Sequence, residues 1–515
     1  MGVCLRKVNE YLVENKEILV LLVLLGGFFF SNLGAYKMFM WDEAEYASIA
    51  RSVLRGDGYV LNGESHVMRI PTYPLSIAAA FALFGVSYEV SKIPGIFFAL
   101  LSVFAVYFFA AKYVDKKTGI VAAFLVAITP IYFTYALNTL SDLPFSSLFF
   151  VSAVFFYMGI NRDVKYFYPA GIFLGLSFLA RYNAVLMVPI LGVYFGYLWL
   201  VDRKKLFCVF KSKHTYLSLV LFLVVVGPWL FYVRGVTGNA LSTLLGAPGR
   251  FASYTDVSFP WYYYLVLAYS NLGAAVFFLF VIGVGYVVYK RMDFGVYCLG
   301  FLVVNFAYFS RFAWKEERMM VSWIPFMVVL SGIGLVRVVE PWLKRDFKSE
   351  YLSCGACALV LLILMYFNYT SVIAPKLEYS TAIGYPSLMQ ASSFVGAESG
   401  VDESIVGASI PQYFWYADRI VRGYPRDAKG LVDLIDEGGI SFVLIGNYER
   451  NQPQYVVSMF SQAFLDEGGR FRNPDDEQNV MFFGDVAHFN DPMNYPVTIV
   501  VPSDLFVERV RDFAG

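Results

Sequence analysis

Charged residues are scarce in this 515-residue chain. They make up 16% of the sequence, hydrophobic residues make up 58%, and the mean hydropathy is +0.57. Soluble globular domains carry about 25% charged residues, so this composition indicates a polytopic membrane protein. The 40 basic and 40 acidic residues balance, and no basic tract suggests nucleic-acid binding.

Cysteine is also rare, with five residues in the whole chain. All five lie in or beside apolar segments or in loops expected inside the cell, so no disulfide framework is expected. Cys354 and Cys357 have the spacing of a redox or zinc pair, but they open an apolar helix and have no second pair. The chain lacks a phosphate-binding P-loop and a dinucleotide fingerprint, which leaves ATP-driven transport without support.

Long apolar runs are abundant instead. Eleven stretches are read as membrane-spanning helices, and the first is expected to be retained because it is too long for a signal peptide and lacks a small-residue cleavage site. They run approximately over residues 18–36, 93–113, 118–137, 143–160, 166–179, 184–201, 216–233, 262–288, 294–309, 319–336 and 352–367.

Basic residues gather in every second connection between these spans. The clusters lie at 6–16, 116–117, 162–165, 203–213, 290–291 and 344–348. By the positive-inside rule, these connections and the N-terminus face the cytoplasm. The apolar stretch 71–86 would reverse this pattern if it crossed the membrane. It is short and bounded by Pro71 and Pro74, so we interpret it as an interfacial or re-entrant helix on the outer side.

The composition changes after the last span. Acidic and turn residues concentrate over 375–515, where short β-rich runs at 404–407, 441–445 and 497–501 alternate with helical patterns at 428–437 and 455–467. We therefore predict two domains: a transmembrane catalytic domain over 1–374 and a soluble extracytoplasmic α/β domain over 375–515.

Three carboxylates occur within four residues just after the first span, in the run Trp41-Asp42-Glu43-Ala44-Glu45-Tyr46. A carboxylate inside hydrocarbon costs about 2.5 to 3.5 kcal/mol, so acids placed here face a water-filled cavity or the membrane interface. The alternative is that they only begin a helix, where acids complement the helix dipole.

This run, followed by Gly56-Asp57-Gly58-Tyr59 and Pro71-Thr72-Tyr73-Pro74-Leu75, resembles the start of the membrane glycosyltransferases of GT-C fold. It looks most like the protein O-mannosyltransferase and lipid A aminoarabinose transferase type. Later segments agree in order: Leu140-Ser141-Asp142-Leu143-Pro144, Leu179-Ala180-Arg181-Tyr182-Asn183 and Pro228-Trp229. The resemblance implies about 11–13 transmembrane helices, interfacial helices in the first outer loop and a C-terminal extracytoplasmic α/β domain.

The implied activity is inverting transfer of a single sugar, mannose or similar, from a dolichyl or polyprenyl phosphate to a protein or glycolipid acceptor on the outer face. Asp42 is the candidate general base by its place in the motif, and such a base contributes about 10² to 10⁴-fold. On a helix, Glu43 would point about 100° away from Asp42, so it is better suited to orient the loop than to share the proton. Asp142 matches the second acidic position of the family; a helix-start acid before Pro144 is the alternative.

A lipid-phosphate leaving group needs cations, because its charge rises as the glycosidic bond breaks. The candidates outside the membrane are Lys315, Arg318, Arg69 and Arg181. The run Trp314-Lys315-Glu316-Glu317-Arg318 resembles the His-Lys-Glu-Glu-Arg motif of mannosyltransferases, with Trp314 in place of the histidine. Interfacial snorkelling is the alternative for each cation.

A divalent metal is an open question, since Glu64 and His66 of the first outer loop could join a carboxylate–histidine site. The aminoarabinose transferases place a metal-binding acid in a Glu-Lys-Pro step where this chain has Arg69-Ile70-Pro71. No other cofactor is expected.

Three alternative functions remain. A polysaccharide polymerase would use similar lipid-linked donors, but its usual mark is a long outer loop between spans rather than a C-terminal domain. A lipid-linked sugar flippase or secondary transporter would explain the spans without chemistry, although transporters often place their charges at the bilayer midplane. An oligosaccharyltransferase would carry a Trp-Trp-Asp-Tyr-Gly motif, which Phe414-Trp415-Tyr416-Ala417-Asp418 does not match. With no targeting peptide and few cysteines, the expected location is the cytoplasmic membrane of a prokaryote.

Overall fold

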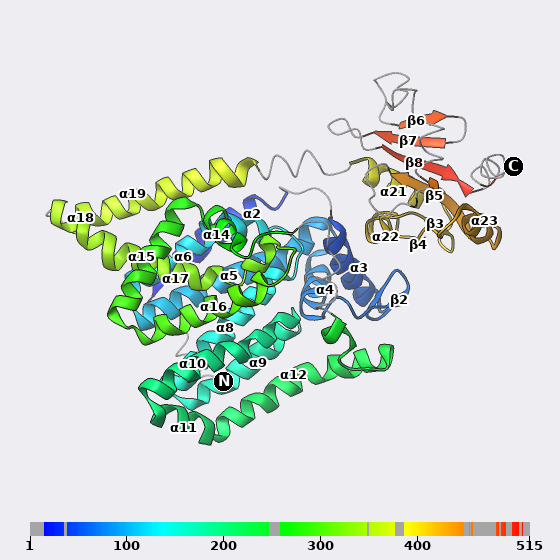
Figure 1. Ribbon diagram of the computed structural model, residues 1–515. Coiled ribbons are helices and arrows are strands. Elements are labelled where there is room, and N and C mark those ends of the chain that lie inside the picture. The colour runs from blue at the N-terminus through cyan, green and yellow to red at the C-terminus, as the bar shows by residue number, and fades with distance from the viewer. Residues whose placement is uncertain are drawn as a thin grey trace. The chain divides into compact units, whose positions relative to one another are not determined.

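The computed structural model (Figure 1) describes residues 15–34, 39–246, 258–347, 350–375, 386–446, 453, 455–456, 480–483, 486–490, 497–503 and 507. The chain divides into two compact units. The helical unit comprises Met1–Gly34, Val67–Ala80 and Glu89–Leu377, and the sheet unit comprises Ala35–His66, Phe81–Tyr88 and Glu378–Gly515. The sheet unit thus includes most of the loop between α2 and α5 in addition to the predicted C-terminal domain.

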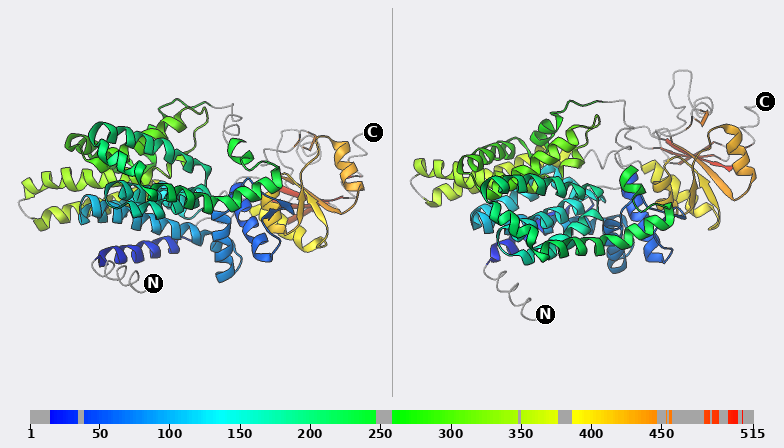
Figure 2. Two further views of the ribbon diagram at one scale, coloured as in Figure 1. Left: turned by 90° about the horizontal axis from the view of Figure 1, so that it is seen from below. Right: turned by 60° about the horizontal axis from the view of Figure 1, so that its bottom comes forward.

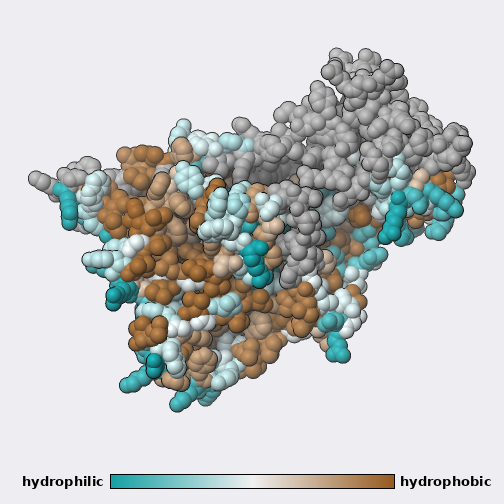
Figure 3. Space-filling model, in the orientation of Figure 1, coloured by the Kyte–Doolittle hydropathy of each residue, from teal (hydrophilic) through white to brown (hydrophobic). Residues whose placement is uncertain are grey.

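The helical unit is a set of mostly apolar helices, many of which lie side by side in all three views (Figures 1 and 2). They are α2 (Lys16–Ser31), α4 (Thr72–Phe84) up to Ala80, α5 (Tyr88–Tyr113) from Glu89, α6 (Lys116–Ile128), α7 (Pro130–Ala136), α8 (Asp142–Asn161), α9 (Phe167–Phe178), α10 (Met187–Val201), α11 (Arg203–Lys211), α12 (Lys213–Thr237), α14 (Tyr263–Leu272), α15 (Ala274–Lys290), α16 (Asp293–Ser310), α17 (Ile324–Ile333), α18 (Glu340–Phe347) and α19 (Glu350–Asn368). Hydrophobic side chains dominate the face of this unit shown in Figure 3.

Each of the eleven predicted spans contains helix among its described residues. Among the described residues, six helices are long and apolar enough to cross a membrane, or up to eight if each of two bent pairs counts as one span. The other three predicted spans correspond to α2, α9 and α19, of which α2 has 16 residues and α9 has 12. The stretch 71–86 forms the 13-residue helix α4, and its interfacial placement remains a prediction.

The two bent pairs depart from the straight spans predicted over 118–137 and 262–288. The chain bends by 64° between α6 and α7, just before Pro130, which cannot continue the hydrogen-bond ladder. It bends by 115° between α14 and α15, at Gly273. Gly273 has a φ of 80°, in the left-handed region that favours glycine. A Cβ atom there would lie 2.3 Å from Oδ1 of Asn368.

Asn368 joins the two breaks. Its side-chain amide donates to the carbonyl oxygen of Ile128 at 3.3 Å and to that of Leu272 at 3.5 Å, the last residues of α6 and α14. Carbonyls at a break inside a bilayer have no water to accept from, so a buried amide replaces the missing helical donors.

Replacing Asn368 with Leu should therefore destabilise the protein by about 1 to 2 kcal/mol, the upper range for a hydrogen-bonding side chain within a membrane bundle. Thermal unfolding in detergent measures the change. Asn305→Leu is the matched control, because the amide of Asn305 donates only to a carbonyl of its own helix, that of Phe301. Equal losses in the two variants would contradict the assigned role of Asn368.

The sheet unit is an α/β fold, as the sequence predicts. Its described strands run in the order β4 (Ile420–Arg422), β3 (Ser404–Val406), β5 (Ile440–Gly446), β8 (Val497–Pro502), β7 (Val486–Asn490) and β6 (Val480–Phe483). The first three are parallel to one another, and the others pair antiparallel. Helices α21 (Pro386–Glu398), α22 (Ile410–Ala417) and α23 (Ala428–Asp436) accompany them.

The predicted strands at 404–407, 441–445 and 497–501 correspond to β3, β5 and β8, and the helix predicted at 428–437 is α23. Most of the helix predicted over 455–467 lies outside the described residues. Two clusters of buried hydrophobic side chains form the core: one includes Leu431 and Val443, and the other Tyr413 and Leu444.

The loop that follows α2 adds the helix α3 (Trp41–Arg55) and a hairpin of β1 (Val60–Leu61) and β2 (Glu64–Ser65) to this unit. Asn62 and Gly63 form the two-residue hairpin turn, and their φ angles of 53° and 80° suit a type I′ turn. The side chain of Asn62 both accepts from the backbone amide of Val421, at 2.8 Å, and donates to its carbonyl, at 2.7 Å. The hairpin tip therefore docks on the edge strand β4.

Candidate functional site

In the helical unit, a buried ion pair links two of the predicted site residues. Asp142 is the first residue of α8 and only 1% of it is exposed. Its Oδ1 lies 2.7 Å from Nη1 of Arg181, which follows the end of α9. Nε of Arg181 donates to Oγ of Ser141 at 3.3 Å, so the guanidinium is held by two neighbouring residues at the start of α8. Its side chain keeps 17% exposure.

Helix α4 begins beside this pair. The backbone amide of Thr72 donates to the carbonyl of Leu179 at 2.9 Å, and its hydroxyl donates to that of Leu176 at 3.0 Å. These bonds fix the start of α4 against the end of α9, two residues before Arg181. Arg69 is three residues before Thr72, so a second predicted cation lies in the segment that leads into α4.

The turn that contains Arg318 also lies close to Arg181. Nη1 of Arg181 lies 4.0 Å from the sulfur of Met319, in the turn Glu317–Met320. Arg318 forms an ion pair with Glu316, which also accepts from the indole of Trp314 at 3.0 Å. The side chains of the Trp314–Arg318 run thus contact one another, and the indole of Trp314 donates a hydrogen bond at the position where the motif has histidine.

Lys315 has a different setting from the one that the motif suggests. Only 5% of it is exposed, and its ammonium donates to the carbonyl oxygens of Phe259 at 3.0 Å and Phe312 at 2.6 Å. Burial lowers the pKa of Lys315. These contacts tie two connections of the helical unit together, so Lys315 has a structural task in addition to its predicted role in phosphate binding.

Asp42 and Glu43 belong to the sheet unit, in the first turn of α3. Glu43 is 3% exposed, and its Oε2 accepts from the backbone amide of Met40 at 2.8 Å. This is the carboxylate half of a capping box, and the role of Glu43 in orienting the loop stays a prediction. Asp42 is half-buried beside it. Its predicted role as a base is left untested by the structure.

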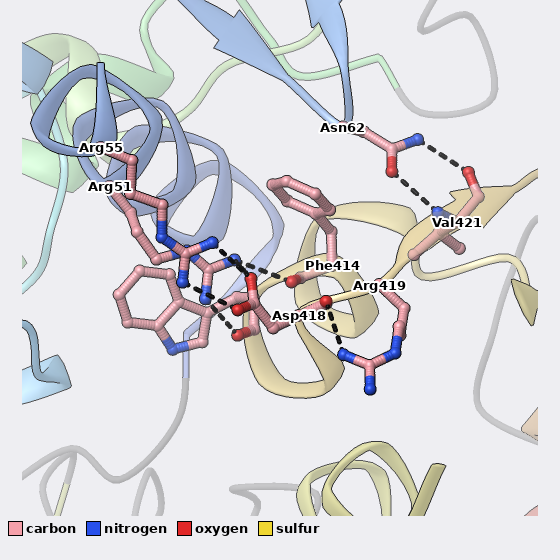
Figure 4. A network of polar contacts seen from close by, with 8 residues as sticks. Arg51, Arg55, Asn62, Phe414, Asp418, Arg419 and Val421 are labelled. Atoms are coloured by element: carbon pink, nitrogen blue, oxygen red, sulfur yellow. Dashed lines mark hydrogen bonds and ion pairs between the residues drawn. The ribbon is translucent and has the colours of Figure 1, made fainter. Parts of the chain in front are cut away.

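A set of contacts that the sequence analysis missed fixes α3 on α22 (Figure 4). Arg51 is buried, and its guanidinium donates to the carbonyls of Phe414 and Trp415, both at 2.9 Å. Its Cζ lies 4.7 Å from the centre of the Trp415 ring. Arg55 binds both carboxylate oxygens of Asp418, at 2.9 and 2.8 Å, and Arg51 approaches the same carboxylate at 3.2 Å.

Burial lowers the pKa of Arg51 to about 10, so the guanidinium remains protonated at neutral pH. The hydrogen bonds from Arg55 lower the pKa of Asp418. One signal for Arg51 was present in the sequence, since it continues the helical spacing of the small residues Ala44, Ala47 and Ser48. Asp418 had none, because it lies more than 360 residues further along the chain.

Glu64 is exposed in β2, and His66 follows that strand. Among the described residues, no group of three or more histidine, cysteine, aspartate or glutamate side chains could hold a metal ion. The two residues alone fall short of the three protein ligands typical of catalytic zinc, so they do not make up such a site by themselves.

Part of the chain matches the model of a known family. Residues 69–232 match the family model described as dolichyl-phosphate-mannose-protein mannosyltransferase. An uncharacterized protein of Aquifex aeolicus (strain VF5) is 28% identical over 225 residues, which cover 42% of this chain and 44% of that protein. This match therefore spans less than half of the relative's length.

Solved structures match nearly the whole chain. ArnT from Cupriavidus metallidurans, bound to undecaprenyl phosphate, has a TM-score of 0.71 at 13% identity, with 94% of this chain and 97% of that chain covered. The oligosaccharyltransferase AglB from Archaeoglobus fulgidus, in complex with an inhibitory peptide and a dolichol-phosphate, has a TM-score of 0.62 at 13% identity, with 95% and 76% covered. The chain thus shares the fold of both structures, which is the GT-C fold that the sequence analysis predicted.

Proposed function

We propose that this protein transfers a single glycosyl group from a polyprenyl-phosphate-linked donor to an acceptor at the membrane surface. The support is the family match over 69–232 together with the GT-C fold, whose solved examples include structures holding undecaprenyl phosphate and dolichol-phosphate. Mannose is the first donor sugar to test, because the matched family uses dolichyl-phosphate mannose. A protein or a glycolipid would act as acceptor on the outer face of a prokaryotic cytoplasmic membrane.

The observation that carries this proposal is the buried pair of Asp142 and Arg181, with Arg318 in the adjoining turn. As the bond between the anomeric carbon and the phosphate oxygen breaks, the electron pair stays on the lipid phosphate and its negative charge rises. A guanidinium already held by Asp142 and Ser141 stabilises that charge without reorganising. Asp142 therefore positions Arg181, and Arg69 and Lys315 are further candidate phosphate ligands.

The acceptor side of the reaction needs a base when the acceptor is a hydroxyl. The oxygen attacks the anomeric carbon from the face opposite the phosphate, and its proton passes to a carboxylate. Asp42 is the proposed base, and this assignment rests on its place in the motif. Glu43 then serves by capping the helix that carries Asp42.

Arg181→Gln should lower donor cleavage about 10² to 10³-fold, the usual loss when one preorganised donor is removed from developing charge. The assay uses purified protein in lipid with radiolabelled polyprenyl-phosphate mannose and a membrane extract, and follows lipid-phosphate release. Arg311→Gln is the matched control, because Arg311 is an exposed cation on the connection after α16 that stacks on Tyr308. It should retain nearly the full rate.

An unchanged rate in Arg181→Gln would remove Arg181 from the reaction. If the wild-type protein cleaves no sugar-phosphate lipid but moves such lipids across the bilayer, it is a flippase and the proposal of glycosyl transfer is wrong.

A further inference from the structure

Helix α11 (Arg203–Lys211) is a short amphipathic helix held between two spans. Asp202 separates it from α10 and caps it, accepting from the backbone amide of Lys205 at 3.0 Å. Ser212 separates it from α12 and caps that helix, accepting from the amide of His214 at 3.3 Å. Because α10 and α12 belong to two of the membrane-spanning segments, the helix between them lies at one surface of the bilayer.

One side of α11 faces the protein. Leu206 and Val209 are buried, and the ammonium of Lys205 donates to Oδ1 of Asn161, the last residue of α8, at 2.8 Å. These contacts set the rotation of the helix. They leave a second side on which Arg203, Lys204 and Lys211 are exposed.

Two phenylalanines interleave with these cations. Phe207 and Phe210 are each 49% exposed. Their rings lie 6.1 Å from Trp199 and 5.3 Å from Phe195 of α10, and Arg203 covers the Trp199 ring at 4.8 Å. The exposed side of α11 is therefore continuous with the surface of α10.

That surface faces lipid. Only 33% of the span ending in α10 and 22% of the span formed by α12 are buried within the protein. Figure 3 shows hydrophilic residues at its lower left, where Figure 1 places α11, bordering the hydrophobic surface of the helices. A helix with basic and aromatic side chains at such a border lies in the headgroup region of the membrane.

The net charge of this segment is strongly positive. Residues 202–213 contain five lysines and arginines and one acid, Asp202. Zwitterionic headgroups do not neutralise such a cluster, whereas each lysine or arginine near an anionic surface attracts it by about 1 kcal/mol.

We propose that the exposed side of α11, with Arg203, Lys204, Phe207, Phe210 and Lys211, is a binding surface for anionic phospholipid headgroups in the adjacent leaflet. The cations contact the phosphodiester groups, and the two rings enter the acyl boundary below them. This inference is independent of the proposed glycosyl transfer.

Native mass spectrometry of the purified full-length protein tests it, with dioleoyl phosphatidylglycerol and dioleoyl phosphatidylcholine as probes. Wild type should retain phosphatidylglycerol in preference to phosphatidylcholine. In Lys204→Gln/Lys211→Gln the preference should fall about 25-fold, which is about fivefold per cation at 1 kcal/mol each. Both side chains are exposed, so unfolding temperature in detergent should match that of wild type.

The matched control is Lys290→Gln/Arg291→Asn, which removes two exposed cations from another connection on the side that the positive-inside pattern assigns to the cytoplasm. Asparagine is chosen at 291 because that residue has a φ of 50°. This control should keep the lipid preference of wild type. A wild-type protein that retains both lipids equally, or an α11 variant that keeps the full preference, would overturn the proposal.

Discussion

Asp42→Asn is expected to lower sugar transfer by about 10² to 10⁴-fold while donor binding is retained, since the amide keeps the shape of the side chain but cannot take a proton. Folding should be retained as well, because the cap of α3 is formed by Glu43 and not by Asp42. Lipid-phosphate release from labelled donor measures the rate of transfer. Equilibrium binding of the donor to wild type and variant measures whether its affinity is retained.

Glu45→Gln provides the control for Asp42→Asn. Glu45 is a carboxylate in the same turn of α3, and its Oε1 accepts from the indole of Trp41 at 3.1 Å, a bond that a glutamine oxygen can still accept. Its transfer rate should stay within about threefold of wild type. Should Asp42→Asn transfer sugar as fast as Glu45→Gln, Asp42 would not be the base.

Arg51→Ala is expected to destabilise the sheet unit by about 2 to 6 kcal/mol, because two carbonyls lose their donor and each buried acceptor left unsatisfied costs about 1 to 3 kcal/mol. The carbonyls of Phe414 and Trp415 would lose a charged donor, and the Trp415 ring would lose the guanidinium that covers it. Chemical unfolding reports the free energy, and hydrogen exchange of the amides in 41–55 reports whether α3 detaches from α22.

Arg55→Ala tests whether the loss of stability expected in Arg51→Ala comes from the burial of the Arg51 contacts. Arg55 makes the geometrically better pair with Asp418, but its side chain is 50% exposed, and exposed pairs contribute about 0 to 1 kcal/mol. The loss should therefore be well below that of Arg51→Ala. Comparable losses in the two variants would show that the ion pair, and not the buried carbonyl contacts, holds α3.

The same cluster has a pH dependence. Since hydrogen bonding from Arg55 lowers the pKa of Asp418 below its ordinary value of 3.8, the folded state binds the proton less readily than the unfolded chain. The carboxylate therefore stabilises the fold above that value, and the contribution is lost as the pH falls through the folded pKa. Unfolding curves of Asp418→Asn should decline less steeply with acid than those of wild type.

Much of the architecture could be predicted from the sequence, because hydrophobicity and turn residues act locally. The eleven apolar runs became helices, and the strands at 404–406, 440–446 and 497–502 lie where β-rich runs occur. The helix breaks at Pro130 and Gly273 were not predicted, because each residue permits a bend without requiring one. The bend depends on Asn368, which accommodates the carbonyls left at both breaks from a distant helix.

The sequence by itself determined that this is a membrane protein with a separate α/β region, and its motifs indicated the GT-C group. Only the tertiary structure decided that Asp142 pairs with Arg181, that Lys315 is bound by two carbonyls, and that the helix carrying Asp42 packs on residues near Asp418. The physical reason is the separation along the chain between the residues that interact. Composition and periodicity report burial one segment at a time, whereas an ion pair depends on which distant segments the fold brings within about 4 Å.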